Sequence, residues 1–209
     1  PVISVNDMRK NKFKIGSVGQ IIDGVNVKIA KDGEILCKGP NIMMGYYKDL
    51  EKTAEVMTDD YFHTGDIGEI DKQGFLKITD RKKEMFKTSG GKYISPQVIE
   101  NIMKQSLFIE QIMVVGDGRK MPTALIQPNI EYVMKWLADN GTPSKSLEEA
   151  CKEESLLKAL QKEIENYNEK FGSWERIKKF ELVPEEWSID AGHLTPTMKL
   201  KRKVVKEKY

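Results

Sequence analysis

Alternation of apolar and polar residues dominates the first part of the chain and predicts strands. Residues 18–30 alternate around a glycine turn and predict two strands, and residues 33–37 predict a third. Residues 61–80 predict two more strands on either side of a turn at Gly74. Residues 50–57 carry the pattern of a short amphipathic helix. The first 80 residues or so are therefore expected to be mainly antiparallel β-structure.

The composition changes at residues 80–84, a charged run with little apolar content that we interpret as a linker. After it, Ser95 and Pro96 suit the start of a helix, as a capping residue and a first-turn residue. The pattern then predicts strands over 109–115 and 123–127, helices over 129–138 and 146–170, a strand over 177–183 and a helical tail from Pro196. This order indicates a small α+β domain.

Charge and composition narrow the function classes. The 209 residues are 39% hydrophobic and 32% charged, as in an ordinary globular protein, and their net charge is +2. Such a balance does not favour a nucleic-acid partner. No apolar run is long enough for a transmembrane helix. Cys37 and Cys151 stand far apart, which predicts neither a disulfide framework nor a metal site and fits a reducing cytoplasm.

The first segment with candidate chemistry is 61–66, Tyr-Phe-His-Thr-Gly-Asp. A carboxylate at the end of a strand and beside a glycine, such as Asp66, can accept hydrogen bonds from the two vicinal hydroxyls of a ribose. An aspartate that caps a hairpin turn would give the same local pattern. From this segment alone the capping interpretation is favoured.

Two further segments carry cations and glycines. Arg81 can hold a phosphate or hydroxyl through its fork of donors, and Gly90 and Gly91 allow a backbone to approach a ligand closely. A solvated charged loop and a simple hairpin turn are the alternatives. In the tail, Lys199 and Lys201 are point charges suited to a phosphate or carboxylate, although composition alone favours a basic surface helix.

Taken together and in order, these segments resemble a known family. Gly33-Glu34-Ile35, the 61–66 segment and the block from Asp80 through Ser89-Gly90-Gly91 to Pro96 resemble the later motifs of adenylate-forming enzymes, which include acyl-CoA synthetases, luciferases and adenylation domains of peptide synthetases. The resemblance runs from about Gly16 to the end of the chain. The Thr-Pro-Thr-x-Lys-x-Lys-Arg tail and the charged segment around 139–175 resemble the long-chain fatty acid–CoA ligase branch.

The resemblance implies a role for each candidate residue. It implies that Asp66 and Arg81 bind the ribose of ATP or AMP, that Asp80 is the hinge, that Gly90 and Gly91 form the loop on the CoA side, and that Lys201 is the catalytic lysine. Many relatives place a glycine directly before the catalytic lysine, whereas Leu200 stands here. Lys199 therefore remains an alternative, and we favour Lys201.

The resemblance also implies a division of the chain and a set of substrates. Residues 1–79 would be the β-rich distal part of the large AMP-binding domain, 80–81 the hinge and 82–209 the small C-terminal α+β domain. ATP with Mg²⁺, CoA and a fatty acid are implied as ligands of the longer enzyme. The magnesium ligands and acyl pocket are expected before Pro1, so we expect no metal site in this chain and no catalysis by it alone. Peripheral membrane contact stays open.

Two other functions fit the same residues. One is a related adenylating enzyme that acts on an aryl or amino acid, because the residues that would select the acid are not in this sequence. The other is a binding module that works by itself. A longer open reading frame that contains this sequence would argue against the second.

Overall fold

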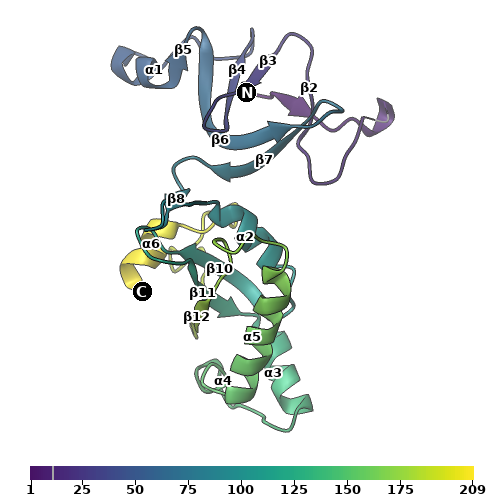
Figure 1. Cartoon of the computed structure of the whole chain (residues 1–209), viewed down its shortest axis with the longest axis vertical. Helices are drawn as coiled ribbons and strands as arrows, with labels where there is room; N and C mark the ends of the chain where they lie inside the picture. Colours follow the sequence, from purple (N-terminus) through teal and green to yellow (C-terminus); the bar gives the residue numbers. More distant parts are fainter. Residues whose placement is uncertain (11) are drawn as a thin grey trace. The chain divides into compact units, whose positions relative to one another are not determined.

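The computed structural model describes residues 1–10 and 12–209, which divide into two units, Pro1–Met85 and Phe86–Tyr209 (Figure 1). The first unit is built on a seven-stranded sheet in the order β1-β2-β7-β6-β4-β3, with β5 paired to β6. Its strands are β1 (Ser4–Val5), β2 (Gly19–Ile21), β3 (Asn26–Ile29), β4 (Glu34–Lys38), β5 (Met57–Thr58), β6 (Tyr61–Ile70) and β7 (Phe75–Arg81). Every pairing is antiparallel, which confirms the expected β-structure.

Two short helical segments accompany this sheet, η1 (Met8–Lys10) and α1 (Leu50–Val56). The Asp49 side chain caps α1 by accepting a hydrogen bond from the Lys52 amide. The position of α1 confirms the sequence prediction. However, the apolar side chains of this amphipathic helix are not buried: none of Leu50–Val56 is buried in the described structure, and Leu50 is 85% exposed.

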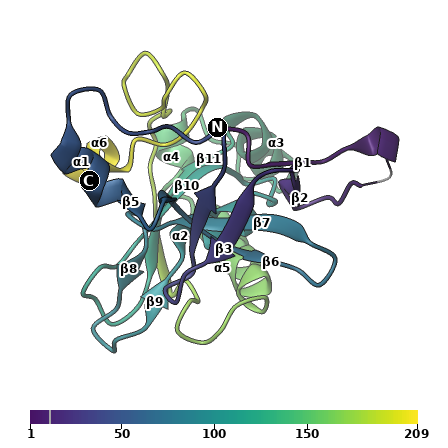
Figure 2. The ribbon, with the colours of Figure 1, turned by 90° about the horizontal axis from the view of Figure 1, so that it is seen from above.

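The second unit contains two sheets. The strands β8 (Phe86–Lys87) and β9 (Tyr93–Ile94) form a two-stranded ribbon (Figure 2). The strands β10 (Ile109–Val115), β11 (Thr123–Pro128) and β12 (Lys179–Leu182) form a three-stranded sheet in which β12 runs parallel to β11. Its helices are α2 (Pro96–Met103), α3 (Ile130–Asp139), α4 (Leu147–Ala150), α5 (Glu154–Asn168) and α6 (Arg202–Lys208). The α+β fold class is thereby confirmed.

Alternation along β10 and β11 gives the second unit apolar side chains on both faces of its sheet. On one face, Ile112, Val114 and Ile126 pack in the main core with buried residues of α2, α3 and α5. On the other face, Met113 packs with Val205 of α6 in a smaller cluster. The chain's last helix is thus held by an apolar contact on the sheet.

Several elements differ from the sequence prediction. The expected helix over 146–170 is interrupted after Ala150, and α5 begins at Glu154. At 3.6 residues per turn, Ala150 and Leu156 would point about 120° apart on one straight helix. The interruption lets both side chains be fully buried.

The tail is not helical from Pro196, since α6 begins only at Arg202. The Thr195 amide donates to the Lys199 carbonyl at 2.8 Å, and Met198 has a φ of 60°, so these residues form a tight turn. At the other end of the unit, Ser95 is the N-cap of α2, as predicted, but its side chain makes no capping hydrogen bond.

Residues 80–84 are not a freely solvated linker. Asp80 and Arg81 are the last two residues of β7, paired with β6, and Asp80 is completely buried. One reason is electrostatic: Arg81 and Lys82 of this run pair with carboxylates of the first unit, as described below.

A truncation in the main core tests this packing. Leu160 of α5 is fully buried in the cluster, so Leu160→Ala should lower the free energy of unfolding of the second unit by about 2–5 kcal/mol. Urea unfolding followed by tryptophan fluorescence measures this unit, because Trp136, Trp174 and Trp187 all lie in it. Leu107→Ala, at a side chain that is 67% exposed, should change the free energy by less than about 0.5 kcal/mol.

Candidate functional site

The two residues predicted to contact a ribose lie side by side at the end of the β6–β7 pair. Asp66 and Arg81 face each other in the register, and the Arg81 Nε lies 2.7 Å from the Asp66 Oδ1. The Asp66 side chain is 19% exposed and that of Arg81 is 49% exposed, so both groups reach solvent. The structure thus brings together a carboxylate and a guanidinium, which can accept from and donate to a polyhydroxylated ligand.

Asp80, the predicted hinge residue, lies directly before this pair. Its Oδ1 accepts a hydrogen bond from the Arg81 amide at 2.6 Å, and its backbone pairs with Ile67 of β6. The buried side chain holds the backbone that carries Arg81. Asp80 therefore has a local structural role in addition to any role as a hinge.

Glu34, the first residue of β4, organises the segment of β6 that carries Asp66. Glu34 is 3% exposed, and its carboxylate accepts hydrogen bonds from three groups. The Gly65 amide donates to Oε1 at 3.0 Å, and the His63 Nδ1 and the Lys82 Nζ lie 3.0 Å and 2.7 Å from Oε2. We call Glu34, His63, Gly65 and Lys82, together with Asp32, the Glu34 cluster.

The Glu34 cluster contains a second ion pair and a backbone hydrogen bond. The Lys82 Nζ also lies 2.7 Å from the Asp32 Oδ2, and the Lys82 amide donates to the Gly65 carbonyl at 2.8 Å. The hydrogen bond from Lys82 is the largest cause that lowers the pKa of Asp32, and the same carboxylates raise the pKa of Lys82. Lys82, which sequence reasoning had not singled out, is therefore a bridge between two acidic residues.

Burial and hydrogen bonding act in opposite directions on Glu34. Burial raises the pKa of its carboxyl, but the hydrogen bonds from Lys82, His63 and the Gly65 amide outweigh it, and the net pKa is lowered. The sequence did hold a hint of this role. Glu34 opens a strand whose next three residues, 35–37, are all buried and apolar, so its side chain had to find partners.

The glycine pair lies in the turn between β8 and β9 of the second unit. The Gly91 amide donates to the Thr88 carbonyl at 2.9 Å, and Gly91 has a φ of +78°, which favours glycine. Gly90 does not have such a φ, and a Cβ there would meet only the Thr88 hydroxyl at 3.9 Å. The turn accounts for Gly91, whereas Gly90 has no local steric reason to be glycine.

Both candidate lysines of the tail have exposed side chains but different backbones. Lys199 lies in the tight turn, where its amide donates to the Thr195 Oγ1 at 3.0 Å. Lys201 is the N-cap of α6, and its amide donates to the His193 carbonyl at 2.8 Å. Its neighbour Arg202 pairs with Glu100 through Nη1 at 2.5 Å. The backbone of Lys201 is thus held on both sides while its side chain reaches solvent.

Comparison with known proteins identifies the relatives of this chain. Residues 83–209 match the model of the family described as AMP-binding enzyme C-terminal domain. The chain belongs to this family. It is 39% identical over 200 residues to the long-chain-fatty-acid–CoA ligase FadD15 of Mycobacterium tuberculosis, which covers 95% of this chain and 33% of the relative. It is 41% identical over 175 residues to human long-chain-fatty-acid–CoA ligase 1, over 82% of this chain and 25% of that protein.

Solved structures of AMP-binding enzymes share the fold. The adenylation domain of a carboxylic acid reductase from Segniliparus rugosus, in complex with AMP and a co-purified carboxylic acid, matches with a TM-score of 0.74 at 23% identity, over 93% of this chain and 33% of that one. The anthranilate CoA ligase AuaEII matches with a TM-score of 0.71 at 21% identity, over 99% and 37%. The chain thus spans between a quarter and a little over a third of the length of these relatives.

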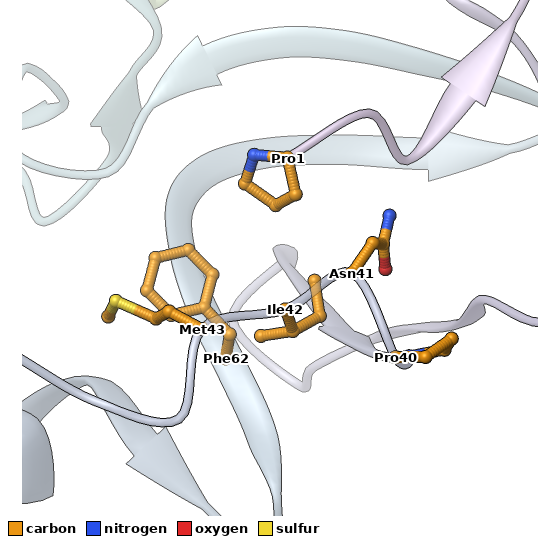
Figure 3. Close-up of a pocket in the computed structure, with 6 residues that line it drawn as sticks. All are labelled: Pro1, Pro40, Asn41, Ile42, Met43 and Phe62. Carbon is orange, nitrogen blue, oxygen red and sulfur yellow. The ribbon is translucent and has the colours of Figure 1, made fainter.

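An open hollow of about 330 Å³ lies elsewhere in the first unit (Figure 3). Its lining is mostly apolar and consists of Pro1, Pro40, Asn41, Ile42, Met43 and Phe62. None of the predicted site residues lines it. Among the described residues no helix is long and apolar enough to cross a bilayer, and no group of three or more potential metal ligands occurs.

The balance of burial and hydrogen bonding at Glu34 makes a pH-dependent prediction. Because the pKa of Glu34 is lowered from its ordinary value of 4.5, its ionised form stabilises the first unit fully above about pH 4.5, and this contribution is lost as the pH falls through the folded-state pKa. The amide shift of Gly65, followed by ¹⁵N NMR, should titrate with a midpoint below 4.5.

Removing the Lys82 ammonium should raise the midpoint of this titration. In Lys82→Met the raising effect of burial meets less opposition, so the Gly65 midpoint should move upward. Lys77→Met, which removes a lysine of β7 whose ion pair with Glu69 is exposed, should leave that midpoint unchanged. Equal midpoints in the wild-type chain and Lys82→Met would contradict the assignment of Lys82 as the main partner.

Proposed function

We propose that this chain is the C-terminal part of a long-chain fatty acid–CoA ligase, which converts a fatty acid, ATP and CoA into acyl-CoA, AMP and pyrophosphate. The observation that carries the proposal is the identity of 39% to a long-chain ligase over nearly the whole chain. Asp66 and Arg81, the two residues that the resemblance assigns to the ribose, are adjacent in space.

In the first half-reaction a carboxylate oxygen of the fatty acid attacks the α-phosphorus of ATP, and pyrophosphate leaves. Asp66 and Arg81 would fix the ribose and with it the position of the α-phosphate. The Lys201 ammonium would neutralise the negative charge that builds on the carboxylate and phosphate oxygens. A magnesium ion, whose ligands we place outside this chain, would supply further charge neutralisation on the phosphates.

Two observations support Lys201 over Lys199 as this cation. Leu200 packs on the apolar cluster around Met113 and Trp187, and Arg202 is held by Glu100, so the backbone at 201 is fixed between two contacts. Lys199 instead follows Met198 in an exposed turn. A lysine on a fixed backbone delivers its charge to one place with a smaller loss of conformational entropy.

In the second half-reaction the CoA thiolate attacks the acyl carbon of the acyl-adenylate, and AMP leaves. Rotation of the second unit about Asp80 would withdraw Lys201 and bring the Gly90–Gly91 turn to the site. Gly90 supports this role, because its own turn does not require a glycine and a ligand that approaches the backbone would.

The test uses a longer protein that contains this sequence together with the rest of the large domain. With palmitate, the wild-type protein should catalyse ATP–pyrophosphate exchange, whereas the 209-residue chain alone should not. Exchange with an aryl or short-chain acid in place of palmitate would overturn the long-chain assignment. Absence of exchange with every acid tried would overturn the proposed reaction.

A lysine substitution separates the two half-reactions. Lys201→Ala should lower pyrophosphate exchange by about 100-fold or more, because it removes a charge that acts on the adenylation transition state. Formation of palmitoyl-CoA from supplied palmitoyl-adenylate and CoA should stay within about threefold of wild type. Lys199→Ala is the matched variant and should affect both rates little. The reverse ranking of the two lysines would assign catalysis to Lys199.

A further inference from the structure

The Glu34 cluster connects the loop of Asp66 with the segment that follows Asp80. Two hydrogen bonds of the cluster involve the backbone of Gly65. Its amide donates to the Glu34 carboxylate, and its carbonyl accepts from the Lys82 amide. Asp66, the next residue, therefore follows a glycine whose amide and carbonyl are both held by hydrogen bonds.

The geometry of the strand pair explains why a carboxylate is needed there. Between the pairs Glu34–Ile67 and Leu36–His63, β4 advances by two residues while β6 advances by four, so residues 64–66 bulge out of the β4–β6 ladder, although Asp66 stays paired with Arg81 of β7. A bulge leaves backbone groups without ladder partners. The Glu34 side chain accepts from one of them, the Gly65 amide, and the Thr64 hydroxyl donates to the Ile35 carbonyl at 2.7 Å.

Lys82 is the member of the cluster that comes after Asp80. It makes three contacts with residues that precede Asp80: its Nζ lies 2.7 Å from a carboxylate oxygen of each of Glu34 and Asp32, and its amide donates to the Gly65 carbonyl at 2.8 Å. A pivot at Asp80 that carried Lys82 along would break all three. It would also leave the buried Glu34 without its cation, which is costly.

We propose that Glu34 is a positioning residue for Asp66, and that its pair with Lys82 must separate when the chain pivots about Asp80. The state of the hinge is thereby transmitted to the ribose-binding loop through Gly65. The part of this inference that concerns the hinge rests on the proposed function, whereas the part that concerns the loop does not.

The loop is tested first, on the 209-residue chain itself. In Lys82→Met the Gly65 amide should exchange its hydrogen about tenfold faster than in wild type, since the carboxylate that holds it has lost its cation. Lys82→Arg should restore much of the protection. Amides of Ile112–Val114 in the second unit are the internal reference, and Lys77→Met is the matched control.

Unchanged exchange at Gly65 in Lys82→Met would overturn the positioning role, whatever the reaction proves to be. Glu34→Gln should act in the same direction, and Lys82→Met keeps the test valid if that variant fails to fold.

The hinge is tested in the longer ligase. There, Lys82→Met should change the ratio of the pyrophosphate-exchange rate to the thioester-forming rate by at least about fivefold, because it removes an interaction present in only one of the two conformations. A structural defect that merely lowers the amount of active enzyme would reduce both rates equally and leave the ratio unchanged. An unchanged ratio together with faster Gly65 exchange would overturn the coupling. If the wild-type ligase shows no exchange with any acid, the proposed function fails, and the Gly65 measurement still decides the positioning role.

Discussion

Burial of the Glu34 carboxylate is the constraint on which the first unit depends. A charge removed from water must be balanced by donors at short range, or the sheet around it would lose stability. Three donors reach it from three places in the chain: His63 before the bulge, Gly65 within it and Lys82 after β7. The carboxylate therefore fixes not one contact but the mutual placement of β4, the bulge and the end of β7.

A second buried carboxylate serves the second unit in a comparable way. Glu100 of α2 accepts a hydrogen bond from the Val114 amide at 2.7 Å and pairs with Arg202, which also donates to the Val114 carbonyl at 2.5 Å. The pair connects the first helix of this unit, its first long strand and the start of its last helix. The last residues of the chain are therefore part of the packed structure, and Lys201 directly precedes the paired Arg202.

Strands and helices followed from the sequence wherever a periodic pattern coincided with burial. Strands β10 and β11 were predicted closely, because their inward and outward positions are both apolar and turn residues bound them. The interruption between α4 and α5 was missed, since helical propensity continues through it and only the core decides which face Ala150 presents. The turn at 195–199 was missed for a related reason: the Thr195 side chain and carbonyl compete with helical hydrogen bonds, and a basic composition hides this.

The sequence motifs singled out Asp66, Asp80, Arg81 and Lys201, whereas Glu34 and Lys82 were missed. Asp66, Arg81 and Lys201 carry groups that suit a nucleotide, so a motif reveals them. Glu34 and Lys82 act through contacts between β4 and the end of β7, which are separated by more than forty residues of sequence, and no local pattern encodes such a pairing.

The division between exposed and buried groups has a chemical consequence. A group that must meet a charged ligand gains most when its own backbone does not have to be ordered at the moment of binding. Asp66 follows a glycine held through both of its backbone groups, and Lys201 lies between a packed leucine and a paired arginine. In each case a buried carboxylate, Glu34 or Glu100, orders the backbone during folding, before any ligand binds. Substitution of such a carboxylate should therefore weaken the function of an exposed side chain whose own chemistry is unchanged.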